Sequence, residues 1–187
     1  MSSIQCFFLD PTPLCQVYLK RIGHPRRRCA IRTSHRCTSA APLIAVPRKD
    51  QADGDFWPHD DDRWPEMCDW CSTLFDHYDV WNVVHETIYR KRGTDETMTL
   101  RDAPPGAMWD AHWMKQHRMP GPDGRYLCVR LPDYRDWFID GPGVDERNPT
   151  RSTWSRTGFV PYVTVNPPVK TGGWHGKLED GILVTLS

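Results

Sequence analysis

The sequence of 187 residues lacks several features that would point to a function directly. It has no run of about 18 apolar residues, so we expect no membrane span. It also lacks a Gly-rich phosphate-binding loop, a nucleophile-elbow motif and a His-Glu-x-x-His pair. These absences argue against nucleotide-binding, hydrolase and metalloprotease sites of the common kinds. We therefore predict that the protein is not an enzyme.

The sequence also shows no signal peptide and no disulfide framework. The first apolar stretch has no basic residue before it and ends at Asp10-Pro11, which is too short for a secretion signal. The chain has seven cysteines, and an odd number does not suit paired disulfides. We therefore expect the protein to remain in a reducing cytoplasm, or in a particle assembled there, where clustered cysteines are typical metal ligands.

Net charge is also absent, because 24 basic residues balance 24 acidic ones. The balance hides an asymmetry between two neighbouring segments. Residues 1–50 carry nine basic and two acidic side chains, whereas residues 51–80 carry one basic and nine acidic side chains. Either the two segments attract each other or occupy separate solvated faces, or the basic one forms a surface for nucleic acid or an acidic partner.

Aliphatic residues are few, but nine Trp, six Tyr and six Phe can supply a core. β-Branched and aromatic runs between turn residues predict an α+β fold, mainly antiparallel β-sheet with one or two short helices. Turns are expected at residues 10–13 and 132–135 and at Asp180-Gly181. Residues 107–117 are predicted as a helix, because Trp109 and Trp113 are four apart. Strands are expected at 4–9, 14–21, 79–90, 97–101, 126–131, 136–140, 160–165 and 174–186.

We expect a single domain over residues 1–187, in which residues 22–78 form a loop region stabilised by zinc. Residues 23–47 show little periodicity, and residues 50–65 are acidic with two Trp-Pro pairs, so both stretches are predicted as loops. A loop of this length has no apolar face of its own to order it. A bound metal would offset its chain entropy.

The strongest motif is Cys68-x-x-Cys71. This spacing places two thiolates on a tight turn facing one tetrahedral ion, and zinc takes four such ligands. Upstream candidates for the other two are Cys29, His35 and Cys37. We predict Cys29, His35, Cys68 and Cys71 as the ligand set, with Cys37 as the substitute for either upstream residue. The alternatives are two loop thiols without a metal, or a redox pair, for which no βαβ context is present.

Two other clusters suggest different functions. His59 beside Asp60, Asp61 and Asp62 could bind a catalytic divalent metal, although successive residues of an extended loop point in different directions. A basic group on the upstream loop could contact phosphates of a nucleic acid. Its members are Arg26, Arg27, Arg28, Arg32 and Arg36.

Several blocks of sequence resemble a family of tailed-bacteriophage and prophage proteins without a known activity. They are Asp-Gly-Asp-Phe-Trp-Pro-His-Asp-Asp at 53–61, Arg-Trp-Pro at 63–65, the Cys68-x-x-Cys71 pair and Thr-Leu-Arg-Asp-Ala-Pro-Pro-Gly-Ala-Met-Trp-Asp-Ala at 99–111. In that family a Gly follows the second cysteine, where this chain has Ser72. The difference matters because the position favours a positive φ.

The resemblance implies a phage origin but brings no known activity. Together with the cysteine pair it leads us to expect a non-enzymatic, zinc-stabilised binding or assembly module that contacts phage or host proteins. Such a module would act in the host cytoplasm and as a component of the virion, and it could form a homo-oligomer. The alternatives are an intracellular nucleic-acid-binding or host-takeover protein, and a metal-dependent enzyme that uses His59 and residues 60–62.

Overall fold

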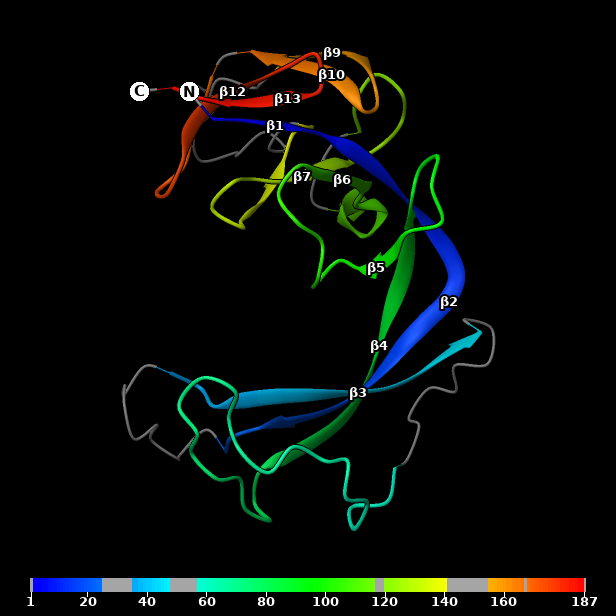
Figure 1. Cartoon of the computed structure of the whole chain (residues 1–187), viewed down its shortest axis with the longest axis vertical. Helices are drawn as coiled ribbons and strands as arrows, with labels where there is room; N and C mark the ends of the chain where they lie inside the picture. Colours follow the sequence, from blue (N-terminus) through cyan, green and yellow to red (C-terminus); the bar gives the residue numbers. More distant parts are fainter. Residues whose placement is uncertain are drawn as a thin grey trace. The chain divides into compact units, whose positions relative to one another are not determined.

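The computed structural model describes residues 2–24, 35–47, 57–116, 120–140, 155–166 and 168–186 (Figure 1). The chain folds as two units, one made of Met1–Asp10 with Tyr89–Ser187 and the other of Pro11–Ile88. We call them unit 1 and unit 2. The single domain expected over residues 1–187 stays a prediction.

Unit 1 contains a four-stranded antiparallel sheet in the order β1–β13–β12–β11. In Figure 1 the blue β1 runs beside the red β13, and Ser3 pairs with Val184. β9 and β10 form a separate antiparallel pair. The bounds of these strands are β1 (Ser3–Gln5), β9 (Ser155–Phe159), β10 (Tyr162–Asn166), β11 (Val169–Lys170), β12 (His175–Glu179) and β13 (Ile182–Thr185).

A second sheet has the order β5–β4–β2–β6–β7–β8, and β3 also pairs with β2. β2 runs parallel to β6, whereas β6–β7 and β7–β8 are antiparallel. The bounds are β2 (Phe7–Ile22), β3 (Thr38–Pro47), β4 (Val80–Lys91), β5 (Thr97–Thr99), β6 (Ala107–Asp110), β7 (Leu127–Arg130) and β8 (Asp136–Phe138). β2 and β4 both cross the boundary between the units.

The core of unit 1 lies around β6 and β7. Met108 is fully buried among apolar residues of the four-stranded sheet, including Leu178 and Leu183. The next residue, Trp109, is buried in a second cluster with Leu9. Consecutive buried side chains on opposite faces show that β6 is covered on both sides, as in the interior of a packed sheet.

Unit 2 is built on the part of β2 from Pro11 onward, which pairs antiparallel with β3. Cys15, Val17, Leu19 and Arg21 alternate along β2, and all four are buried. The β2–β3 register shifts between Gln16 and Tyr18. Since three of the four buried side chains are apolar, this face of β2 serves as the core face of unit 2.

The predicted mainly β-sheet architecture is confirmed, but the predicted helices are wrong within the described residues, which contain no α-helix. Residues 107–110 form β6, and His112–Gln116 form only a short 3₁₀ helix, η2. Trp109 is 1% exposed and Trp113 is 45% exposed, so the two do not share one buried face. The apolar run was ambiguous, because a doubly buried strand and a helix segment look alike in sequence.

Strands occupy one predicted turn and the last part of one predicted loop. The turn expected at residues 10–13 is absent, since β2 passes straight through it. The Thr12 hydroxyl donates a hydrogen bond of 2.7 Å to the Ile88 carbonyl, so a side chain binds β4 beside Pro11 and Pro13, which have no N–H to donate. The loop expected over residues 23–47 ends in β3. By contrast, the Asp180-Gly181 turn is confirmed, with φ values of 47° and 71°.

Candidate metal centre

The Cys68-x-x-Cys71 pair lies on a short β-hairpin of residues 66–75, which we call the knuckle hairpin. Its base is closed by a hydrogen bond of 2.8 Å from the Phe75 N–H to the Glu66 carbonyl, and Met67 bridges Leu74. Because side chains alternate along a strand, Cys68 points to the opposite face from Met67. The hairpin therefore has an inner face with the cysteines and an outer face with Met67 and Leu74.

The turn of the knuckle hairpin is tightened at Ser72. The Ser72 N–H donates to the Cys68 carbonyl at 3.0 Å, and the Cys68 N–H donates to the Thr73 carbonyl at 3.0 Å. Ser72 has a φ of 54°, the left-handed conformation that favours glycine. The predicted preference of this position for positive φ is therefore confirmed, and serine adopts it at a cost in strain.

The second pair of candidate ligands comes from the segment that leads into β3. Cys37 precedes the first paired residue, Thr38, which lies opposite Ile22 at the end of β2. The Gly23 N–H then donates to the Cys37 carbonyl at 2.8 Å. The β2–β3 ladder thus continues to Cys37 and fixes its position, while His35 lies two residues upstream.

The structure brings His35, Cys37, Cys68 and Cys71 together, with one donor atom from each lying within 4.8 Å of all the others. His35 Nε2 lies 3.3 Å from Cys68 Sγ, and Cys37 Sγ lies 3.5 Å from Cys71 Sγ. The three cysteines are 6%, 1% and 9% exposed in chain order. These four residues can hold a metal ion.

The electrostatics of the cluster favour the thiolate form of Cys68, which is the form that binds metals. Burial raises the pKa of the Cys68 thiol, but hydrogen bonds with His35 and with the backbone of Trp70, Cys71 and Thr38 lower it to about 6. The hydrogen bond with Cys68 in turn raises the pKa of His35. Without a metal, the pair thus tends towards a thiolate beside an imidazolium, and His35 would have to release its proton to act as a metal ligand.

Arg21 of β2 holds both ends of the knuckle hairpin. Its guanidinium donates to the Pro65 carbonyl at 3.2 Å and to the Asp76 carbonyl at 2.7 Å, which are the residues on either side of the hairpin. The same group lies 3.8 Å from the centre of the Trp81 ring and 5.1 Å from that of Phe75. The hairpin is therefore fixed to the sheet of unit 2 through one buried cation.

Asp79 ties the end of β2 to the residue that follows the knuckle hairpin. Its carboxylate accepts a hydrogen bond of 2.7 Å from the Asp76 N–H and another of 2.7 Å from the His24 N–H. Asp76 directly follows the knuckle hairpin, and His24 follows the end of β2. Arg21 and Asp79 thus connect β2 to the hairpin by two independent polar contacts.

Neither Arg21 nor Asp79 was predicted as part of the site. A signal for Arg21 is present in the sequence, because it continues the alternation of Cys15, Val17 and Leu19 on the buried face of β2. A charged residue at a position of a strand that faces the core needs hydrogen-bond partners, and backbone carbonyls of a nearby turn are common ones. For Asp79 we find no comparable signal.

The other predicted ligands and contacts are placed as follows. Cys37, the predicted substitute, lies in the cluster with His35 and the cysteine pair. Cys29 lies outside the described residues, as do Arg26, Arg27, Arg28 and Arg32. Arg36 is exposed and donates to the Gly23 carbonyl at 3.4 Å.

The acidic run beside His59 does not converge on a metal site in the described residues. His59 stacks on Trp81, with ring centres 4.5 Å apart and planes at 13°. The Asp61 carboxylate accepts hydrogen bonds from the Arg63 guanidinium and from the Trp57 indole. The hydrogen bonds from Arg63 lower the pKa of Asp61. This carboxylate therefore acts as the centre of a local turn.

Comparisons with protein-family models, with curated proteins and with solved structures find no match for the chain. Among the residues that the structure describes, no helix is long and apolar enough to cross a membrane.

Proposed function

We propose that the protein is a non-enzymatic binding module whose unit 2 is stabilised by zinc at His35, Cys37, Cys68 and Cys71. The observation that supports this proposal is the convergence of four protein donors within 4.8 Å. Around a tetrahedral zinc ion, donors at metal distances of about 2.0–2.3 Å lie roughly 3.5–3.8 Å apart. The separations of His35 Nε2 from Cys68 Sγ and of Cys37 Sγ from Cys71 Sγ, 3.3 and 3.5 Å, are close to that range.

A site with four protein ligands is closed and has no open position for water or substrate. The metal would therefore supply folding free energy and no chemistry. Among the described residues the apolar cluster around it is small, with Phe75 the one further hydrophobic side chain packed against the three cysteines. Zinc binding contributes about 10–16 kcal/mol in zinc-finger peptides, which is enough to order segments with so little core.

Metal analysis of the purified protein tests the proposal. We expect one equivalent of zinc, which Cys68→Ser should lose together with a large part of the thermal stability. Cys15→Ala is the matched control, because Cys15 is equally buried but lies outside the cluster. Less than half an equivalent of zinc in the wild type, or an unchanged melting temperature in Cys68→Ser, would contradict the proposal.

We further propose that the partners are phage or host proteins met in the host cytoplasm or in the virion, and this part rests on the sequence blocks that resemble phage proteins. Mass spectrometry of purified virions tests it. Detection at a stoichiometric level is the expected result, and absence from the particle would refute the virion assignment while leaving the zinc site untouched.

A further inference from the structure

The outer face of the knuckle hairpin is apolar and exposed. Met67 and Leu74 lie directly opposite each other in the antiparallel bridge and are 44% and 59% exposed. Residues paired in this way point to the same side, so their side chains form one surface. Trp70, at the tip of the hairpin, is 53% exposed. The Trp70 ring packs beside His35, so it adjoins the Met67–Leu74 surface at the tip. We call these three exposed side chains, Met67 and Leu74 on the outer side and Trp70 at the tip, the knuckle face.

The knuckle face is held in place by the candidate metal site beneath it. Met67 precedes Cys68 in the chain, and Trp70 lies between the two cysteines, with its ring centre 4.5 Å from that of His35. One ion would fix the four candidate ligands, and the hairpin that carries the face would then be rigid. The face would therefore lose little conformational entropy when it binds a partner. Pre-organisation of this kind favours affinity.

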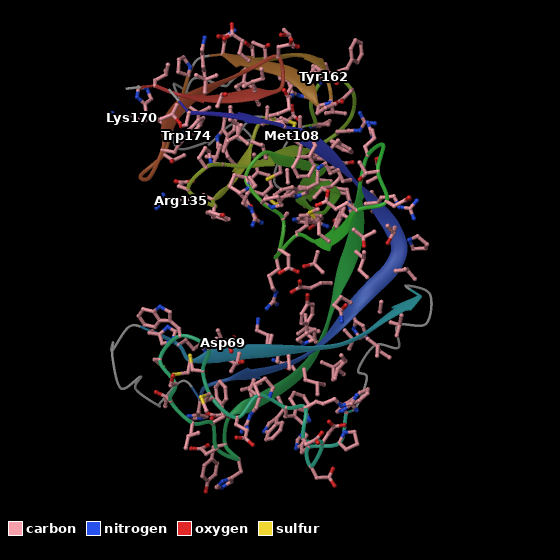
Figure 2. All side chains as sticks on the ribbon, viewed as in Figure 1. Asp69, Met108, Arg135, Tyr162, Lys170 and Trp174 are labelled. Carbon is pink, nitrogen blue, oxygen red and sulfur yellow. The ribbon has the colours of Figure 1, made fainter. Side chains whose placement is uncertain are left out.

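The stretch of chain that carries the knuckle face bears acidic side chains and no Lys or Arg. No Lys or Arg occurs between Trp64 and Tyr89. Glu66, Asp69 and Asp76 of the same stretch are exposed. Figure 2 shows Asp69 beside β3, where it accepts a hydrogen bond of 2.5 Å from the Ser39 hydroxyl. The hairpin and the residue after it thus carry exposed carboxylates, which repel a phosphate backbone and attract a basic partner. Cations from neighbouring segments include the buried Arg21 and the exposed Arg36 beside His35.

We infer that the knuckle face docks a basic protein segment, in which Lys or Arg side chains flank bulky apolar ones. The apolar side chains would cover Met67 and Leu74, and a cation would lie on the Trp70 indole or between the neighbouring carboxylates. Trp and Met are enriched in the centres of protein interfaces, and Trp is frequent among the residues that dominate binding. The inference rests on the proposed function, because it names the chemistry of the partner that the zinc-stabilised module binds.

Fluorescence anisotropy with three labelled probes tests the inference on the full chain loaded with zinc. The probes are a short peptide with alternating Lys-Lys and Leu-Leu pairs, the same peptide with Glu in place of Lys, and a single-stranded oligonucleotide. The test variant is Met67→Ser/Leu74→Ser. The control variant is Phe159→Ser, which removes a side chain that is 83% exposed in unit 1. Zinc content is measured for each protein.

We expect the basic peptide to bind, with an affinity at least about tenfold lower in Met67→Ser/Leu74→Ser and unchanged in Phe159→Ser. The acidic peptide and the oligonucleotide should bind at least about tenfold more weakly than the basic one. The inference would be overturned if the acidic peptide bound as tightly as the basic one, or if Met67→Ser/Leu74→Ser bound the basic peptide as tightly as the wild type. It would also be overturned if the oligonucleotide bound the wild type and this binding were lost in the double variant.

A second copy of the chain is the remaining occupant, and sedimentation velocity at several concentrations tests it. Self-association that the double substitution abolishes would overturn the inference in favour of a homo-oligomer. If the protein retained zinc but did not bind the basic peptide, the docking of a basic segment on the knuckle face would be refuted and the zinc site would stand. Absence of zinc from the wild type would refute the proposed function.

Discussion

Replacing Arg21 by Met should weaken both the fold of unit 2 and its affinity for zinc. Arg21 is 6% exposed, and its two hydrogen bonds reach the carbonyls of Pro65 and Asp76 on either side of the knuckle hairpin. A hydrogen bond from a charged donor contributes about 1.5–3 kcal/mol. Methionine keeps most of the apolar contact with Trp81 but leaves both carbonyls without this donor. We therefore expect a loss of about 4 kcal/mol in the free energy of unfolding.

The effect on zinc follows from the position of the two carbonyls. When they are released, the ends of the knuckle hairpin separate more easily, and part of the binding free energy must order them again. A cost of about 1.4–2.8 kcal/mol corresponds to a 10- to 100-fold weaker zinc affinity. Urea unfolding measures the first effect, and competition with a coloured chelator measures the second. Arg21→Lys should recover about half of each, since an ammonium lacks the planar fork that reaches both carbonyls.

Arg130→Met is the matched control for this experiment. Arg130 is also buried, and it donates to the Ala103 and Leu100 carbonyls at 3.1 and 2.8 Å, but these contacts lie in unit 1. It should lower stability without changing zinc affinity. The reasoning would be refuted if Arg21→Met unfolded at the same urea concentration as the wild type, or if Arg130→Met weakened zinc binding as much.

Three further results are expected. Ser72→Gly should stabilise the protein by about 1 kcal/mol in urea unfolding, because glycine adopts the φ of 54° without strain; a loss of stability would contradict the turn geometry. Cys37→Ala should lose zinc in metal analysis while Cys29→Ala keeps it, and the reverse would restore Cys29 as the ligand. Burial raises the pKa of Asp123, but hydrogen bonds from Arg156 lower it to about 2. The stability difference between wild type and Asp123→Asn should thus be full above about pH 4 and vanish as the pH falls through 2; a difference that does not change with pH would exclude this ion pair as its source.

The parts of the fold that sequence predicted correctly are those fixed by neighbouring residues. Asp180-Gly181 specifies its hairpin turn locally, and Cys68-x-x-Cys71 specifies its knuckle, including the positive φ at Ser72. β3 was missed because it forms a strand only by pairing with the distant β2. The prolines within β3 also hide its strand character in the sequence. Predictions from short patterns fail where the partner lies elsewhere in the chain.

The choice between the upstream cysteines shows the same limit within the site. From spacing we predicted Cys29 as a ligand and Cys37 only as a substitute, although both precede the knuckle by several tens of residues. The structure places Cys37 in the cluster because Thr38 pairs with Ile22 and carries the preceding residue to the end of β2. The position of Cys37 in the candidate cluster thus depends on a strand register, which sequence reasoning did not provide.

The division of the chain has a consequence for synthesis on the ribosome. Unit 2 is one continuous segment, Pro11–Ile88, whereas unit 1 is interrupted by it. β1 must wait for β13, which begins at Ile182, before it has a partner. At about 5–20 residues per second, unit 2 is complete for roughly 5–20 s before that strand emerges. The four candidate ligands all lie in unit 2, so they are in place while the first strand of unit 1 is still unpaired, and a metal bound there would act on the nascent chain first.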